Sequence, residues 1–226
     1  MLDLSPHLEW QAGPETPQLA PGEVHLWRAT LTEPQPGLYD TLSTAEHVRA
    51  GRFYQERDRQ RFITAHGVLR SILGRYLETD PRHVEFAAGP FGKPLLMPNF
   101  RGIHFNLSHS DNLMLLAVAR TREVGVDVEL MRSDVPFESL AEHYFEPTEA
   151  WSIRTAPNEE RATRFYEMWT STEARLKAAG TGFADPGTVV QLDRWSLLTL
   201  TPASGYAAAL AVEGDGFDLQ CWSWPN

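Results

Sequence analysis

Three strand-like segments joined by two short turns constrain the fold of this chain more than any other feature. Residues 103–107 alternate strictly between apolar and polar side chains, residues 113–119 form a continuous apolar run, and residues 124–130 alternate again. The pairs 111–112 and 121–122 supply turn-forming residues between them. Alternation indicates one buried face, and a continuous apolar run indicates burial on both faces. We therefore expect a strand-rich region with a buried middle strand.

Long helices are predicted on either side of this region. One starts at Asp58 and ends before Asp80, with apolar residues recurring at helical spacing along it. The other runs from about Glu159 to Ala178 and ends at Gly180, a residue type that commonly terminates helices. Each helix carries an apolar stripe that can pack against a neighbouring element.

The rest of the chain has shorter predicted elements. Ser43 or Thr44 caps a helix that runs to about Tyr54, and Glu46 is placed for a capping interaction. Residues 1–22 contain four prolines and indicate an irregular lead-in. Further strands are expected at residues 23–31, 189–191, 197–200, 206–212 and 217–224.

This order of elements predicts an α+β fold with two similar halves that meet near residue 121. We expect an N-terminal half of residues 1–121 and a C-terminal half of residues 122–226. The length of 226 residues suits one large domain or two small ones that share an interface. With 42% hydrophobic and 22% charged residues, the chain can bury a core of useful size without covalent cross-links.

The charge and composition of the chain argue against several functional classes. A formal net charge of −10 argues against broad binding to nucleic acid. No apolar run is long enough to cross a bilayer, and the N-terminus lacks a basic segment followed by an apolar one. We therefore expect no signal peptide, no membrane association and a cytoplasmic location. The single cysteine, Cys221, fits a reducing compartment and is interpreted as an ordinary strand residue.

Basic residues gather in one part of this acidic chain. Residues 49–75 contain seven arginines and only two acidic residues. Such a run fits either a solvated helix face or a site for a compact polyphosphate ligand. The residues alone leave both interpretations open.

Acidic residues two positions apart mark the last of the three strand patterns. Asp127 and Glu129 project to the same face, while Val126 and Val128 enter the core. Two carboxylates about 5 Å apart repel by roughly 3 kcal/mol at an effective dielectric constant of about 20. A hard divalent cation such as Mg²⁺ removes that penalty. The alternative interpretation is an exposed strand with solvated acids.

The second long helix carries another acid and a lysine on one face. Glu173 and Lys177 are four residues apart, so their side chains are neighbours on a helix. Glu173 falls at the border of the apolar stripe, where the helix meets its neighbour. A surface ion pair is the simpler interpretation of these two residues.

Other motifs favour binding over covalent catalysis. Residues 91–94 indicate a turn with Lys93 at its tip, and residues 106–110 run from a strand into a loop. Ser108 and His109 are adjacent, so they point in different directions and do not form a nucleophile–base pair. The sequence has no Cys/His cluster with zinc-ligand spacing and no glycine-rich phosphate loop.

The order and spacing of these motifs resemble the Sfp-type 4′-phosphopantetheinyl transferases. The resemblance rests on residues 91–94 (FGKP), 105–110 (FNLSHS), 124–129 (VGVDVE) and 169–177 (WTSTEARLK). Residues 51–77 also look like the N-terminal helices of that family. The likeness covers roughly residues 23–185 in order.

The resemblance implies a monomer built as a pseudo-dimer of two similar α/β halves, each a small antiparallel sheet packed with a long helix. It implies Mg²⁺-dependent transfer of the 4′-phosphopantetheine moiety of coenzyme A to a serine of an apo acyl or peptidyl carrier protein, with release of 3′,5′-ADP. Such carriers serve fatty acid, polyketide or nonribosomal peptide biosynthesis, and the sequence does not select among them.

By position in these motifs, the resemblance also assigns site residues. The metal ligands are Asp127, Glu129 and Glu173. The catalytic residues are Glu173, as candidate base, and Lys177, in contact with the pyrophosphate. The residues that bind coenzyme A are Arg49, Arg61 and His109 at the 3′-phosphate, Lys93, Pro94 and Ser108 around the adenosine, and Lys177.

One residue departs from the family pattern. Thr172 stands where the family usually has a lysine, in the motif Trp-x-x-Lys-Glu-Ala. Two other functions therefore stay open at the level of sequence. One is a Mg²⁺-dependent hydrolase of nucleotide pyrophosphates that uses the same three acids. The other is a coenzyme A-binding module that has lost catalysis, which Thr172 motivates.

Overall fold

Ten strands and five α-helices make up the part of the chain that the computed structural model describes, residues 8–32, 35–89, 91–98, 101–181 and 192–225. The helices are α1 (Thr44–Ala50), α2 (Glu56–Leu77), α3 (Phe137–Tyr144), α4 (Pro147–Arg154) and α5 (Asn158–Ala179). The strands are β1 (Gln11–Ala12), β2 (Glu23–Thr30), β3 (Glu85–Ala88), β4 (Pro94–Met97), β5 (Ile103–Ser110), β6 (Leu113–Arg120), β7 (Val124–Leu130), β8 (Trp195–Leu200), β9 (Tyr206–Glu213) and β10 (Asp218–Ser223). Short 3-10 helices cover Tyr39–Thr41, Pro81–His83 and Leu192–Arg194.

The strands form two larger sheets and a hairpin. One sheet has the order β1-β10-β2-β6-β5, the other has the order β7-β9-β8, and β3 pairs with β4. Strand β10 pairs parallel with β2, and β1 pairs parallel with β10. The expectation of two purely antiparallel sheets is therefore wrong for the first sheet. The reason is that β10 follows β9 of the second sheet and returns to the edge of β2 in the same direction as β2.

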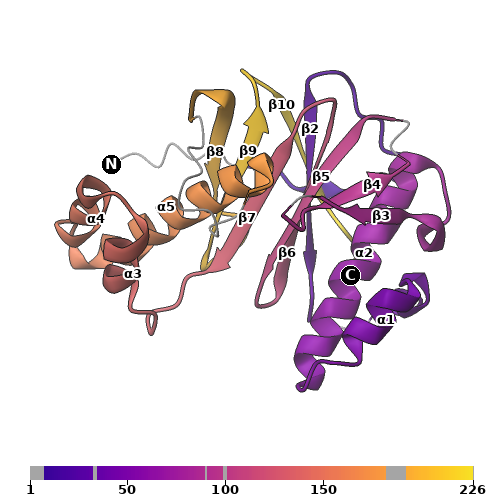
Figure 1. The fold of residues 1–226 in the computed structure, drawn as a ribbon, viewed down its shortest axis with the longest axis horizontal. Helices are drawn as coiled ribbons and strands as arrows, with labels where there is room; N and C mark the ends of the chain where they lie inside the picture. Colours follow the sequence, from indigo (N-terminus) through magenta and orange to yellow (C-terminus); the bar gives the residue numbers. More distant parts are fainter. Residues whose placement is uncertain (1–7, 33–34, 90, 99–100, 182–191, 226) are drawn as a thin grey trace.

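Strand β6 lies between two cores, as its continuous apolar sequence predicts. Met114, Leu116 and Val118 face a core built with α2, whereas Leu115 and Ala117 face a core built with the second sheet. The two sheets therefore pack face to face. Helix α2 covers the outer face of the first sheet and α5 covers the outer face of the second (Figure 1).

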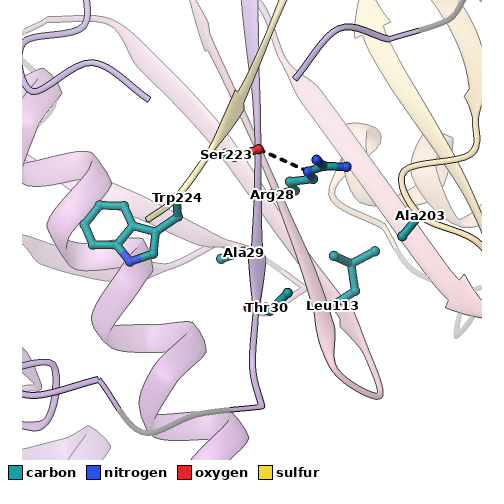
Figure 2. A pocket seen from close by; sticks show the side chains of 7 residues that line it. All are labelled: Arg28, Ala29, Thr30, Leu113, Ala203, Ser223 and Trp224. Carbon is teal, nitrogen blue, oxygen red and sulfur yellow. Dashed lines mark hydrogen bonds between the residues drawn. The ribbon is translucent and has the colours of Figure 1, made fainter. Parts of the chain in front are cut away.

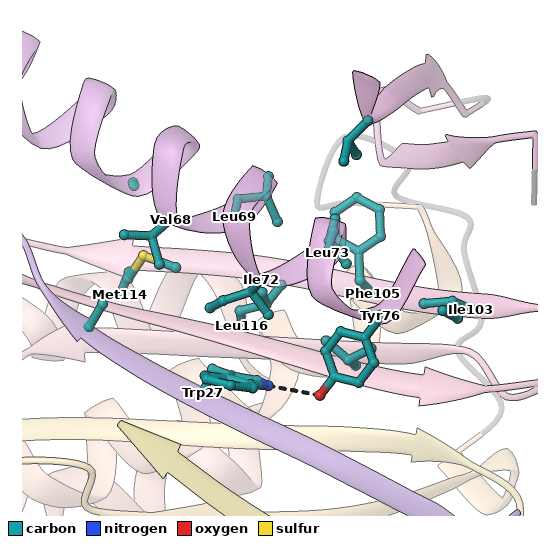
Figure 3. Packing of buried hydrophobic residues seen from close by; sticks show 14 of the residues in the cluster. Trp27, Val68, Leu69, Ile72, Leu73, Tyr76, Ile103, Phe105, Met114 and Leu116 are labelled. Atoms are coloured by element: carbon teal, nitrogen blue, oxygen red, sulfur yellow. Dashed lines mark hydrogen bonds between the residues drawn. The ribbon is translucent and has the colours of Figure 1, made fainter. Parts of the chain in front are cut away.

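The core under α2 is built from helix residues spaced three or four positions apart (Figure 3). Leu69, Ile72 and Tyr76 lie on the helix face that packs over Trp27 of β2. The Trp27 indole nitrogen donates a hydrogen bond to the Tyr76 hydroxyl at 2.9 Å. Full burial of each large apolar side chain contributes about 1.5–3 kcal/mol. This face fixes the position of α2 on the sheet.

Helix α5 approaches β7 closely because residue 125 has no side chain. A Cβ atom at Gly125 would lie 2.1 Å from the carbonyl oxygen of Ala174 and 2.3 Å from the nitrogen of Ala178. Only glycine allows two backbones to come this near. The close approach brings Glu173 and Lys177, the neighbours of these alanines on α5, against β7.

Most predicted elements are confirmed, and the differences lie at boundaries and in weakly patterned segments. The helix capped by Ser43 with Glu46 ends at Ala50 rather than near Tyr54. Helix α5 is terminated by Gly180, which follows its last residue and has a left-handed conformation with φ 71°, as predicted. The patterns do not predict β1, β3, β4, α3 or α4, and the strand expected at 189–191 lies outside the described residues. None of the described helices is long and apolar enough to cross a membrane.

Candidate active site

Side chains from β5 bridge the neighbouring strand β7, where the edges of the two sheets meet. Alternate residues of a strand share a face, so every second residue of β5 points toward β7. His104 Nδ1 lies 2.9 Å from Glu123 Oε1, Asn106 Oδ1 accepts from the Val126 amide at 2.8 Å, Ser108 Oγ donates to Asp127 Oδ1 at 2.9 Å, and Ser110 Oγ donates to Glu129 Oε2 at 2.7 Å. The two acids predicted on β7 are therefore held by hydroxyl groups of β5.

Asp127, Glu129 and Glu173, which we call the acidic cluster, share one electrostatic environment. Burial raises the pKa of Asp127, although the charge and hydrogen bond of Lys177 act against this rise. Burial also raises the pKa of Glu129 and of Glu173. The charge of Asp127 raises both further, because like charges disfavour ionisation. Three carboxylates in this environment are stable as anions only beside a cation.

Lys177 provides positive charge at the acidic cluster. Its Nζ lies 2.5 Å from Asp127 Oδ1 and 3.1 Å from Ser108 Oγ. The other oxygen, Asp127 Oδ2, is buried and has no hydrogen-bond partner. An unpartnered buried carboxylate oxygen is unfavourable, and Mg²⁺ prefers oxygen donors of this kind. The donor set fits a divalent cation.

The three acids are nevertheless not arranged as a complete metal site. In the part of the chain that the structure describes, no three His, Cys, Asp or Glu side chains are placed to hold a metal ion together. Lys177 is bound to Asp127 Oδ1, and Ser110 is bound to Glu129 Oε2. A metal at this cluster must share or displace these contacts. The assignment of three metal ligands therefore stays a prediction.

His109 lies on the face of β5 opposite to the bridging side chains. Phe105, on the same face, packs in the core with α2, so His109 also projects toward α2. The side chain is accessible to solvent, yet partial burial lowers the pKa of its ring. Nearby positive groups lower it further: His66, Lys177, Arg61 and Arg49. We call His109, His66, Arg61 and Arg49 the basic cluster. It is suited to an anion with more than one negative charge.

Protein groups already hold part of the basic cluster in place. Arg61 Nη2 donates to Asp111 Oδ1 at 2.5 Å and to Asn112 Oδ1 at 2.6 Å, in the turn between β5 and β6. The Arg49 guanidinium lies over the Phe62 ring, 5.1 Å from its centre, and Arg49 is exposed. Arg61 is thus fixed beside the end of β5, while Arg49 stays accessible to a ligand.

Lys93 follows the turn at residues 89–92 and its side chain is turned into the protein, so the expectation of a cation at the tip of the turn is wrong. Its Nζ lies 2.7 Å from Glu123 Oε2 and donates to the carbonyl oxygens of Val124 at 3.1 Å and Ala178 at 3.2 Å. The lysine therefore joins the hairpin to β7 and to the C-terminal end of α5, where positive charge is favourable. Pro94 begins β4 beside it. Contact of Lys93 and Pro94 with adenosine stays a prediction.

Sequence reasoning missed two residues of this region. Ser110 belongs to the run from His104 in which every second side chain faces β7, and this polar alternation is the signal that could have identified it. His66 lies within α2 among residues that resemble an ordinary amphipathic helix. No motif in the sequence marks His66, and only the fold brings it near His109.

A cavity of about 180 Å³ beside β2 and the end of β10 is separate from both clusters (Figure 2). Arg28 and Trp224 help to line it, and no predicted site residue does. Arg28 donates to Ser223 Oγ at 3.2 Å and to the carbonyl oxygen of Pro202 at 2.8 Å. The guanidinium therefore fastens β10 and the segment after β8 to β2, which is a structural role.

Two family models match the chain in succession. Residues 26–121 match the model described as 4′-phosphopantetheinyl transferase, N-terminal. Residues 123–222 match the model described as 4′-phosphopantetheinyl transferase superfamily. The first match contains the whole basic cluster, and the second contains the whole acidic cluster.

Individual proteins are similar to the chain over most of its length. The 4′-phosphopantetheinyl transferase HetI of Nostoc sp. is 41% identical over 232 residues, covering 95% of this chain and 98% of its own length. A putative 4′-phosphopantetheinyl transferase of Synechocystis sp. is 35% identical over 164 residues, covering 72% of this chain and 67% of its own length. A 4′-phosphopantetheinyl transferase of Bacillus subtilis is 28% identical over 163 residues, covering 72% and 71%.

Proposed function

The chain belongs to the 4′-phosphopantetheinyl transferase superfamily and transfers 4′-phosphopantetheine to carrier proteins, and from this premise we propose that its two clusters bind the two charged parts of coenzyme A. The 3′-phosphate lies at the basic cluster, the pyrophosphate lies at the acidic cluster, and a serine of an apo acyl or peptidyl carrier protein is the acceptor. One observation carries this proposal. At the end of β5, Ser108 holds Asp127 on one side of the strand, and His109 faces the basic groups on the other.

The acidic cluster is the proposed place for Mg²⁺, with Asp127, Glu129 and Glu173 as ligands. When bound, Mg²⁺ neutralises charge on the phosphate oxygens and so stabilises the transition state of transfer. The unpartnered, buried Asp127 Oδ2 supports this role. Ser108 and Ser110 orient two of the three acids by hydrogen bonds from β5. Preset orientation of this kind strengthens ligand binding.

Lys177 is the proposed contact to the pyrophosphate. Its ammonium lies between Ser108 and Asp127, and its charge also acts on the His109 ring. The lysine is therefore close to both clusters. A pyrophosphate at the acidic cluster draws the ammonium toward its own oxygens, because it offers more negative charge than a single carboxylate.

The transfer forms one bond and breaks one. The carrier serine Oγ attacks the β-phosphorus of coenzyme A, the bond from that phosphorus to the bridging oxygen breaks, and 3′,5′-ADP leaves. Glu173 is the proposed base that takes the serine proton. Positioning of the nucleophile and stabilisation of charge supply most of the rate in such reactions.

We further propose that the molecule is a pseudo-dimer with halves at residues 1–121 and 122–226. Each half supplies one long helix, α2 or α5, and each of these has 22 residues. The two family matches, at 26–121 and 123–222, meet at the proposed boundary. One chain supplies both clusters, which supports a monomer as the active form. A cytoplasmic location is part of the same proposal.

Incubation of the protein with coenzyme A, Mg²⁺ and an apo carrier protein tests this function. We expect mass spectrometry to find the carrier heavier by one phosphopantetheine and 3′,5′-ADP in equal amount, and we expect a metal chelator to abolish both. Cleavage of coenzyme A without a carrier would instead indicate a nucleotide pyrophosphate hydrolase. Binding of coenzyme A without turnover, with turnover restored by Thr172→Lys, would indicate a binding protein that has lost catalysis.

A further inference from the structure

His66 belongs to the basic cluster, but no individual contact to coenzyme A has been assigned to it. Its ring packs on Phe62, with 4.1 Å between the ring centres, and 20% of its side chain is exposed. Its Nδ1 lies 2.9 Å from Glu46 Oε1. Glu46 is held in turn by Arg70, whose Nε donates to Oε2 at 2.6 Å. Groups from α1 and α2 therefore fix the orientation of the His66 ring.

The contact with Glu46 determines which nitrogen of His66 carries a hydrogen. Burial opposes ionisation of Glu46, but hydrogen bonds from His66 and Ser43 and the charge of Arg70 outweigh it and lower the pKa of Glu46 to about 2. Glu46 is therefore a carboxylate that only accepts, so Nδ1 of His66 is the donor. Within the described residues, the hydrogen bonding of His66 is through Nδ1. Nε2 is left for a group that comes from outside the protein.

The fold places this ring at the end of β5. Arg61, on the same helix, binds Asp111 and Asn112 in the turn that follows β5. The Phe62 ring that packs on His66 also lies under the Arg49 guanidinium, 5.1 Å from it. His109 lies on the face of β5 that looks toward α2, and the charge of His66 acts on its ring. The two histidines therefore approach one location from two elements.

We propose that His66 is a further contact to the 3′-phosphate of coenzyme A, through a hydrogen bond at Nε2. The inference rests on the proposed function of the basic cluster. A phosphate monoester carries nearly two negative charges at neutral pH and offers several oxygens, so it can bind a further polar group beside Arg61. His66 is thus a specificity residue that distinguishes coenzyme A from 3′-dephospho-coenzyme A.

Two substitutions test the roles of the two ring nitrogens of His66 separately. The amide nitrogen of His66→Asn can replace Nδ1 and keep the bond to Glu46, but nothing replaces Nε2. The amide nitrogen of His66→Gln can replace Nε2. We expect His66→Asn to raise the KM for coenzyme A about tenfold, since a hydrogen bond to a charged group is lost. For His66→Asn, we expect the KM for 3′-dephospho-coenzyme A and the kcat to change less than about twofold. We expect His66→Gln to raise the KM for coenzyme A less than His66→Asn does.

Steady-state kinetics with both donors, at saturating apo carrier, measure these values. His83→Asn is the matched control, because His83 is an exposed histidine outside both clusters, and its KM for coenzyme A should equal that of the wild type. Thermal unfolding of each variant verifies that the fold is kept. Equal rises of KM for the two donors in His66→Asn, or no rise for either, would overturn the assignment. Absence of transfer by the wild-type protein with either donor would contradict the proposed function itself, and so the two failures are distinct.

Discussion

The acidic and basic clusters lie on opposite faces of one strand, β5, and differ in how the protein balances their charge. In the acidic cluster, burial raises the pKa of all three carboxylates, and Lys177 contacts only one of them. In the basic cluster, Arg61 and His66 each have an acidic partner at hydrogen-bond distance, Asp111 and Glu46. The basic groups are therefore held in place by the protein, whereas the acids are left with an excess of like charge.

This difference indicates which side of the site depends on ligands. The basic cluster is assembled before any ligand binds, because its partners come from α1 and from the turn after β5. The acidic cluster has three carboxylates, and among the described residues one ammonium, that of Lys177, contacts one of them, so the cluster is balanced only when a further cation is present. Substitutions in the acidic cluster should therefore lower turnover, and substitutions in the basic cluster should mainly raise the KM for coenzyme A.

The largest effect is expected from Asp127→Asn. This change removes the buried charge that binds Lys177 and keeps the shape of the side chain. We expect kcat/KM for transfer to fall about 10²–10³-fold, with urea unfolding still cooperative. Asp134→Asn is the control, because Asp134 is an exposed acid paired with Arg132 outside the cluster. Near-normal activity of Asp127→Asn would show that the transfer reaction does not need the acidic cluster.

Gly125→Ala tests the position of the acidic cluster without changing its charges. The added Cβ collides with the Ala174 carbonyl oxygen, so α5 must move away from β7 and carry Glu173 and Lys177 with it. We expect a loss of about 1–3 kcal/mol in stability and a fall of about 100-fold in kcat. Gly51→Ala is the matched control, because the nearest atoms to its Cβ are 3.6 Å away. Equal activity of the two variants would show that close packing of α5 is not needed.

Glu46→Gln tests whether the basic cluster is assembled by its own partners. The pKa of Glu46 is lowered from 4.5 to about 2 in the folded protein. Between these two pH values the folded state therefore binds fewer protons than the unfolded state. The ionised Glu46 thus stabilises the folded protein fully above pH 4.5, and this stabilisation is lost as the pH falls toward 2. At neutral pH we expect the free energy of unfolding of the wild type to be about 1–3 kcal/mol larger than that of Glu46→Gln. This difference should disappear on acidification, and urea unfolding at several pH values measures it. A pH-independent difference would contradict the role of the Glu46 charge.

The smallest effect is expected from Arg61→Ala. Loss of one cation at the 3′-phosphate should raise the KM for coenzyme A about tenfold and change kcat much less. Arg59→Ala is a suitable control, since Arg59 is two residues away and pairs with Glu56 at 3.0 Å. A fall in kcat without a change in KM would indicate that Arg61 acts in turnover, as we expect for the acidic cluster, and not in binding of coenzyme A.

Local patterns were sufficient to predict the elements that carry the acidic and basic clusters. The alternation of residues 124–130 correctly places Val126 and Val128 in the core, with Asp127 on the other face, because side-chain direction in a strand depends only on parity. The capping residues at Ser43 and Glu46 and the helix end at Gly180 are also correct. These features depend on contacts between residues close in sequence, which a pattern can encode.

The features that sequence reasoning missed depend on contacts between distant residues. Lys93 is a turn residue by its neighbours, and only the fold brings Glu123 and the end of α5 to its ammonium. His66 is likewise unremarkable within α2 until β5 brings His109 beside it. The short helices α3 and α4 have too few turns to produce a clear periodicity. Family resemblance supplied the metal ligands, which neither local patterns nor the geometry establishes.

Strand β10 gives the molecule a particular order of assembly. Along its whole length, β10 forms the parallel neighbour of β2, and the Arg28 and Ser223 side chains that join them are 195 residues apart in sequence. During synthesis, β2 therefore leaves the ribosome long before its neighbour exists, with one row of backbone amide and carbonyl groups unpaired. Such an edge can pair with another unfinished chain, and contacts of this sequence separation slow folding. The first sheet is completed only when β10 is made, and a nascent chain is protected from aggregation at this edge only after that step.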